Sequence, residues 1–197
     1  MIKVKFESKD RGRFELVDTA EDLLIRRADR SDVEKLTKLM LLFQRHMEKS
    51  NPRVWRITEE GEAHLREEIE EMLAKEDGRM LVAVKDGAIV GFIYGKFSHR
   101  TTYTPNNIGR NSVLYVKERF RRRGIGRRLV GELCRFFASK NVEEVTLNYI
   151  IGNKEGEGFW KTLGFKPARI GANVQFKELM ERLRGQAIFE TTSVDSI

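Results

Sequence analysis

The sequence predicts an α/β protein in which helices flank a central sheet of mixed strand direction. Two β-rich runs meet at Asp86-Gly87, a dipeptide that favours the tight turn of an antiparallel hairpin because both turn residues need positive φ. Apolar residues recur at helical spacing over 124–140, between strand-like runs at 112–116 and 144–150, which indicates a crossover helix. Hairpins and crossover helices in one chain indicate a mixed sheet.

The first half of the chain supplies strands and two amphipathic helices. Strands are expected at residues 2–7, 12–17 and 23–28, the first two as an extra N-terminal hairpin. Ser31 and Glu34 have the spacing of a capping box and begin a helix over 31–49. Thr58 can cap a second helix over 58–76, whose apolar residues form one stripe.

The second half alternates strands with helices. The expected strands are 80–84, 88–94, 112–116, 144–150, 165–168 and 173–178. Helices are expected over 124–140 and 153–163, with Gly164 in the position after the helix end where left-handed backbone is common. We expect one domain over residues 23–180, preceded by the hairpin extension 1–22 and followed by a tail over 181–197.

Composition excludes several classes of protein. With 197 residues the chain can bury a core unaided, and the single cysteine, Cys134, rules out an internal disulfide or a cysteine-based zinc site. No run approaches the roughly 18 apolar residues of a membrane span, and the N-terminus lacks the apolar core of a secretory signal. We therefore expect a cytoplasmic protein with no bound metal. The Lys/Glu-rich, Gln-poor composition favours a heat-adapted source.

Positive charge is concentrated in one short segment. The formal net charge is +7, and residues 117–128 (KERFRRRGIGRR) hold seven basic residues and one acidic residue, a local net of +6. A cluster of this kind usually faces an anion, which could be nucleic acid, a membrane surface or a phosphorylated small molecule.

The same segment has the features of a phosphate-binding loop. It lies between a strand and a helix, where the first N–H groups of the helix have no intrahelical partner and the helix dipole adds positive charge. Gly124 and Gly126 permit a tight turn and a close approach of phosphate to the backbone. Two commoner nucleotide motifs do not fit, because the Rossmann fingerprint needs glycine where Leu129 stands and the Gly-Lys-Ser/Thr of a P-loop is absent.

Two motifs resemble those of the GNAT N-acetyltransferases. The strand ending at Val116 and the following Arg121-x-x-Gly124-x-Gly126 are similar to the family's Arg/Gln-x-x-Gly-x-Gly acetyl-CoA loop. Downstream, Asn153 and the segment FWKTLGF over 159–165 are similar to the family's Asn…Phe-Tyr-x-x-Leu-Gly-Phe segment. With a looser match near residues 24–33, the resemblance covers roughly 23–180. It implies the GNAT fold and transfer of an acetyl group from acetyl-CoA to an amine.

The resemblance also implies roles for particular residues. The backbone of Leu114, Tyr115 and Val116 would pair with the pantetheine arm like an added strand, and Asn153 would hydrogen-bond the cofactor. The loop that would hold the pyrophosphate comprises Arg121, Arg122, Arg123, Gly124, Ile125 and Gly126. A neutral amine would attack the thioester while a backbone N–H near Val116 polarises its carbonyl. No covalent enzyme intermediate is then needed, so Cys134 is expected in the core.

The usual groups for proton transfer are missing from these motifs. The family's tyrosine, whose hydroxyl can protonate the leaving thiolate, is replaced by Trp160, whose indole N–H can only donate. The glutamate that many members use as a base is replaced by Asn148. His99, at the end of a strand, is the other candidate for proton transfer, and an ordinary surface histidine is the alternative interpretation.

Three functions remain open from the sequence. The first is an acetyl-CoA-dependent N-acetyltransferase, and the second is a GNAT-fold module that binds acyl-CoA without efficient transfer. The third is a nucleic-acid-binding domain, which the sequence disfavours because it has no zinc-finger, RNP or KH pattern. We expect acetyl-CoA and an amine acceptor as partners, with no nucleic acid and no membrane. The acceptor could be a polyamine, an antibiotic, an amino acid, a lysine or a protein N-terminus, and a homodimer is also open.

Overall fold

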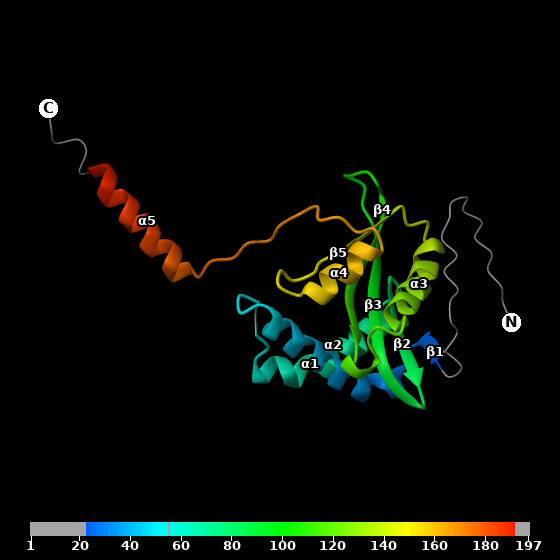
Figure 1. Ribbon diagram of the computed structural model, residues 1–197. Helices are drawn as coiled ribbons and strands as arrows, with labels where there is room; N and C mark the ends of the chain where they lie inside the picture. Colours follow the sequence, from blue (N-terminus) through cyan, green and yellow to red (C-terminus); the bar gives the residue numbers. More distant parts are fainter. Residues whose placement is uncertain (1–22, 55, 192–197) are drawn as a thin grey trace. The chain divides into compact units, whose positions relative to one another are not determined.

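The computed structural model describes residues 23–54 and 56–191 (Figure 1). The described chain forms two compact units, one of residues 23–36 and 67–146 and the other of residues 37–66 and 147–191. The hairpin expected over 2–7 and 12–17 lies outside the described residues. None of the described helices is both long and apolar enough to cross a membrane.

A five-stranded mixed sheet forms the centre of the first unit. Its strands, in spatial as well as chain order, are β1 (Leu23–Arg27), β2 (Gly78–Lys85), β3 (Ala88–His99), β4 (Asn107–Val116) and β5 (Glu144–Leu147). Neighbouring strands from β1 to β4 are antiparallel. The Glu143 N–H donates to the Asn107 carbonyl at 2.9 Å, so β4 and β5 begin side by side and run parallel. The mixed sheet predicted from the sequence is confirmed.

The hairpin between β2 and β3 has the predicted turn. Asp86 and Gly87 both have positive φ, 50° and 71°, which is the conformation that matches the twist of the flanking strands. The strands on either side are longer than the sequence predicts, because their ends carry polar residues that the apolar pattern does not include.

Helix α3 (Ile125–Ala138) covers one face of the sheet (Figure 1). Its buried residues Ile125, Leu129, Leu133, Phe136 and Phe137 pack against Leu81, Ala83, Val90 and Ile93 of the strands. The helix lies so close that a Cβ at Gly95 would be 2.7 Å from Leu133 Cδ2, and one at Gly109 would be 2.8 Å from the Phe137 ring. These two glycines therefore fix the depth at which α3 sits on the sheet.

The entry to α1 (Val33–Ser50) is capped two residues earlier than expected. A short 3-10 turn (Arg30–Asp32) precedes the helix, and the capping box is formed by Asp29 and Asp32 in place of Ser31 and Glu34. Arg26 of β1 binds the buried Asp32 carboxylate with two hydrogen bonds of 2.6 and 2.8 Å. These bonds hold the pKa of Asp32 below its usual value and join the first strand to the first helix.

In the second unit the helix signals are confirmed. The Thr58 hydroxyl accepts from Gly61 N–H at 3.0 Å and caps α2 (Glu59–Ala74). Helix α4 (Lys154–Thr162) ends before Gly164, whose φ of 88° is the left-handed conformation expected there.

The C-terminal part differs from the prediction. The strand expected over 144–150 ends at Leu147, and the strands expected at 165–168 and 173–178 are wrong, because that stretch has no strand and Phe176–Thr191 forms helix α5. Ile170, Val174 and Phe176 alternate as in a strand but are 85%, 50% and 76% exposed. A strand needs a neighbour to satisfy its backbone, whereas a helix satisfies its own.

Candidate functional site

The last residues of β4 present backbone groups on an open edge of the sheet. Lys117 N–H donates to the Val90 carbonyl of β3 at 2.9 Å. Backbone groups alternate in direction along an antiparallel strand, so the N–H and C=O groups of Val116 and Leu114 point away from β3. On that side β5 ends at Leu147, four residues after Glu143, and so reaches only to about the level of Asn111. The edge at Leu114–Val116 is therefore open to a strand-like ligand.

The loop after β4 turns twice through left-handed backbone before α3 begins. A short 3-10 turn (Glu118–Phe120) is followed by Arg122 with φ 60° and Gly124 with φ 75°. Positive φ is uncommon for a residue with a side chain, so Arg122 is held there by the turns around it. Backbone N–H groups in such turns converge and form a concave site for an anion.

The first turn of α3 adds amides to this loop. The first intrahelical bond of the helix start is donated by Arg128 to the Gly124 carbonyl at 3.0 Å, so the amides of Ile125, Gly126 and Arg127 have no intrahelical acceptor. Gly124 is the N-cap and supplies no side-chain hydrogen bond to them. The dipole of the 14-residue helix favours negative charge at this end. The loop and helix start, residues 121–127, are named the anion loop below.

Gly124 has the left-handed backbone that the predicted tight turn requires. The sequence argument gave a tight turn and a close approach of phosphate as the reasons for glycine, and within the protein itself a Cβ at Gly124 would have no atom within 4 Å. Its φ of 75° is the feature that other residues adopt at a cost.

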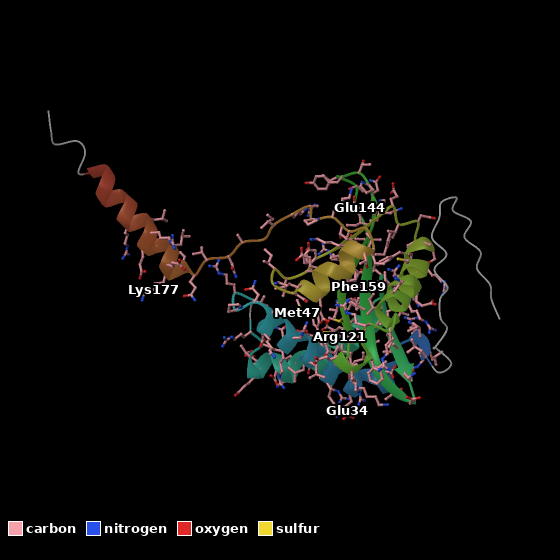
Figure 2. The ribbon with its side chains drawn as sticks, in the orientation of Figure 1. Glu34, Met47, Arg121, Glu144, Phe159 and Lys177 are labelled. Atoms are coloured by element: carbon pink, nitrogen blue, oxygen red, sulfur yellow. The ribbon has the colours of Figure 1, made fainter. Side chains whose placement is uncertain are left out.

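The arginines around the anion loop point in different directions. Arg122, Arg123 and Arg127 are exposed and can meet an anion. Arg128 instead donates to the Leu23 carbonyl of β1 at 3.0 Å, and Arg119 stacks on the Phe120 ring. Arg121 is half-buried and turned toward β4, where its Nε donates to the Val116 carbonyl at 3.0 Å. Glu144, at the start of β5, and Arg121 lie at opposite ends of the sheet (Figure 2).

The downstream motif occupies the second unit. Asn153 is the N-cap of α4, where its Oδ1 accepts from Gly156 N–H at 3.0 Å and its Nδ2 lies 3.7 Å from Met47 Sδ. Trp160 is buried and makes edge-to-face contacts with the Phe159 and Phe165 rings, at centroid distances of 4.8 and 5.4 Å. The three rings thus form a cluster without a phenolic hydroxyl, and the Thr162 hydroxyl of the same segment donates to the Phe159 carbonyl at 2.7 Å.

Of the other sequence candidates, His99 does not reach the open edge of β4. His99 pairs with Asn107 at the far end of β3, and its Nδ1 hydrogen-bonds Asn107 Oδ1 at 2.7 Å. Leu114 pairs with Ile93, six residues away along β3, which is about 20 Å at roughly 3.3 Å per residue. Asn148 is exposed and follows the end of β5.

The expectation that Cys134 lies in the core is wrong. The residue is exposed on α3, although neighbouring atoms still desolvate the thiol enough to raise its pKa. A raised pKa disfavours the thiolate and therefore a nucleophilic role. Within residues 23–54 and 56–191, no three His, Cys, Asp or Glu side chains are grouped so that they could hold a metal ion.

Sequence reasoning missed two features of the anion loop. The sequence gives no sign that Arg122 adopts a left-handed conformation, because arginine has no preference for it. The contact of Arg121 with Val116 was missed because side-chain direction in a loop depends on the fold of the loop itself.

The comparisons with known proteins define the class to which this fold and site belong. The model of the acetyltransferase (GNAT) family matches residues 42–165, more than half of the chain. The chain belongs to this family. No curated protein sequence matches it at a significant level.

Solved structures share the fold at low sequence identity. The BH1408 protein of Bacillus halodurans, in a mutant form, is 18% identical with a TM-score of 0.69 over 78% of this chain and 99% of that one. The aminoglycoside N-acetyltransferase AAC(6')-Iy in complex with CoA is 18% identical with a TM-score of 0.63, over 81% and 98% of the two chains. A ribosomal-protein-alanine N-acetyltransferase from Brucella melitensis biovar Abortus 2308 is 17% identical with a TM-score of 0.58, over 78% and 99%.

Proposed function

We propose that the chain transfers the acetyl group of acetyl-CoA to a primary amine of a small molecule or a protein. One observation carries the proposal: two left-handed residues, Arg122 and Gly124, connect the open edge of β4 to the unpaired amides of α3. The backbone groups of the strand edge are followed along the chain by those of the anion loop. An elongated ligand with a peptide-like arm and a phosphate group at its end fits this arrangement. Membership of the GNAT family supports the proposal.

The chain's own residues suit the two halves of acetyl-CoA. The C=O group of Leu114 and one of the two N–H groups of the edge, at Leu114 or Val116, would pair with the amides of the pantetheine arm, which leaves the other N–H for the thioester carbonyl. The amides of the anion loop would bind the pyrophosphate, with Arg122 and Arg123 at its rim. When bound, the group supplies an acyl thioester. The side-chain amide of Asn153 is already engaged at α4, so its contact with the cofactor stays a prediction.

The proposed reaction is direct attack of a neutral amine on the thioester carbonyl. The new C–N bond forms as the C–S bond breaks, the sulfur leaves as thiolate, and the amine proton passes to water. A backbone N–H of the open edge, at Leu114 or Val116, would donate to the carbonyl oxygen as negative charge develops there. Asn148 cannot act as a base and Trp160 is buried without a hydroxyl, so no side chain of these motifs takes part in proton transfer.

Binding is tested by the melting temperature of the chain with and without acetyl-CoA. A ligand at 100 times its Kd stabilises the folded state by about 2.7 kcal/mol, so the melting temperature should rise by several degrees. A thiol-release assay over a panel of polyamines, aminoglycosides, amino acids and peptides then identifies the acceptor. The absence of any shift at millimolar acetyl-CoA would contradict the proposal.

The pH profile tests the proton-transfer step. Transfer should rise with pH along the ionisation of the acceptor amine, without a lower inflection from an enzyme base. Trp160→Tyr and Asn148→Glu each restore one of the groups that other family members use, and either could raise the rate. A bell-shaped profile in the parent that disappears in His99→Ala would instead identify His99 as the base.

A module that binds acyl-CoA without useful transfer is the second candidate. The buried, hydroxyl-free Trp160 and the amide at Asn148 favour it, since general acid–base help is typically worth about 10²–10⁴-fold in rate. Acetyl-CoA would then raise the melting temperature while no amine in the panel releases thiol above the uncatalysed rate.

A further inference from the structure

We propose that Arg121 is a positioning residue, which ends the open edge of β4 at Val116 and fixes the anion loop to that strand. The phosphate charge is met by its exposed neighbours Arg122 and Arg123. This inference rests on the proposed function and refines it, because sequence reasoning placed Arg121 among the groups that hold the pyrophosphate.

Two contacts of Arg121 are directed at the strand before the loop. Its Nε donates to the Val116 carbonyl at 3.0 Å, and its Cζ lies 5.7 Å from the centroid of the Tyr115 ring. Both contacts hold the half-buried guanidinium against the end of β4, whereas Arg122 and Arg123 are exposed. A side chain that is tied back five residues links the strand and the loop directly.

The bond to Val116 has a consequence for any ligand that adds to this edge. Val116 directs both its N–H and its C=O away from β3, and Arg121 already donates to the C=O. A carbonyl oxygen can accept two hydrogen bonds, but here the guanidinium also takes up room beside it. We infer that a strand-like arm pairs with both groups of Leu114 and only with the N–H of Val116. The ladder ends there, and the ligand has to leave the edge where the anion loop begins. Arg121 in this way sets the register of the arm.

The chemistry of Nε allows position and charge to be separated. In glutamine, Nε2 is attached to Cδ as Nε is in arginine, so Arg121→Gln keeps a donor at the same distance from the backbone and loses the charge. Arg121→Lys keeps the charge but has no donor at that atom, and Arg121→Met keeps the length without donor or charge. A positioning role predicts that the Arg121→Gln variant keeps the parent's affinity and that the Arg121→Lys variant does not. A phosphate-binding role predicts the reverse.

The experiment compares two ligands with the full chain. Affinity for acetyl-CoA is measured by calorimetry, and affinity for acetyl-pantetheine, which has no phosphate, by nuclear magnetic resonance titration. We expect Arg121→Gln to bind both ligands within about twofold of the parent, and Arg121→Lys and Arg121→Met to bind both about three- to tenfold more weakly, the usual effect of one lost hydrogen bond. Arg122→Ala is the comparison variant, and it should weaken only acetyl-CoA.

A readout without ligand keeps the inference separate from the proposed function. The contact between Arg121 and the Val116 carbonyl is present in the ligand-free chain. The parent and the Arg121→Gln variant should therefore melt at a higher temperature than the Arg121→Lys and Arg121→Met variants. A parent that binds neither ligand overturns the proposed function, while the melting order still decides whether Arg121 joins loop and strand. The positioning role is overturned if Lys matches the parent for acetyl-CoA, Gln does not, and acetyl-pantetheine binding is unchanged in all variants.

Discussion

Replacing Gly124 with alanine tests whether left-handed backbone is what the anion loop needs at this position. A Cβ at Gly124 meets no atom within 4 Å, so the substitution adds no clash. Its φ of 75°, however, costs a residue with a side chain roughly 1–2 kcal/mol. Within the protein, the perturbation is therefore conformational strain, expected at roughly 1–2 kcal/mol.

The strain energy appears in one of two places. If the loop keeps its shape, Gly124→Ala lowers the free energy of unfolding by about 1–2 kcal/mol and leaves the affinity for acetyl-CoA unchanged. If the free loop relaxes to a conformation with negative φ, stability recovers and the ligand must restore the strained shape. The Kd then rises about five- to thirtyfold, since about 1.4 kcal/mol corresponds to a factor of ten. The loss of stability and the loss of binding free energy should add up to the same 1–2 kcal/mol.

Gly87→Ala is the matched control. Gly87 has a φ of 71°, and a Cβ there also meets no atom within 4 Å, but it lies in the β2–β3 turn and outside the anion loop. It should lose comparable stability and keep the parent's affinity. Urea unfolding and calorimetry measure the two quantities. The reasoning is refuted if Gly124→Ala matches the parent in both, or if the two variants lose affinity equally.

Other substitutions test contacts outside the anion loop. Asp32→Ala should lower stability by about 1–3 kcal/mol at pH 7 in urea unfolding, since it removes both hydrogen bonds between Arg26 and this buried carboxylate. Because the pKa of Asp32 is lowered in the folded chain, its stabilisation is present at neutral pH and is lost as the pH falls through that depressed value, so the variant and parent should converge in acid. Gly95→Ala should cost about 1–3 kcal/mol, because its Cβ would lie 2.7 Å from Leu133 and 2.9 Å from Phe137. Cys134→Ser should leave acetyl transfer unchanged, and the parent thiol should react with iodoacetamide at pH 8 more slowly than free cysteine.

The parts of the fold that the sequence predicts are those set by local rules. The Asp86-Gly87 turn needs two consecutive residues of positive φ. Only a few dipeptides, such as Asp-Gly, Asn-Gly and Gly-Gly, adopt that conformation readily. Thr58 and Gly164 likewise act within one helical turn of their own position. The amphipathic stripe of α3 predicts its buried face because 3.6-residue periodicity is a property of the helix alone.

Features that depend on distant partners were not predictable in the same way. Asp32 displaces Glu34 from the capping box because Arg26, on another element, holds its carboxylate in place. The alternation of Ile170, Ala172, Val174 and Phe176 is a genuine strand pattern, but a pattern cannot supply the neighbouring strand whose backbone it needs. The burial of Cys134 was inferred from its apolar neighbours, and on α3 the residue falls outside their stripe.

The proposed site divides into a half made of backbone and a half made of side chains, and this division explains which half could be predicted. Strand edge, left-handed turns and helix amides depend on chain conformation, which glycines and strand ends signal in the sequence. Proton transfer depends on particular side chains, and at Asn148 and Trp160 the chain has none that can take part. In the proposed binding mode, backbone groups would bind the part of acyl-CoA that is common to all acyl donors. It follows that the choice of acyl group and of amine must come from side chains beyond the edge of β4 and the anion loop, and that substitutions there should change the acceptor range while leaving the affinity for CoA unchanged.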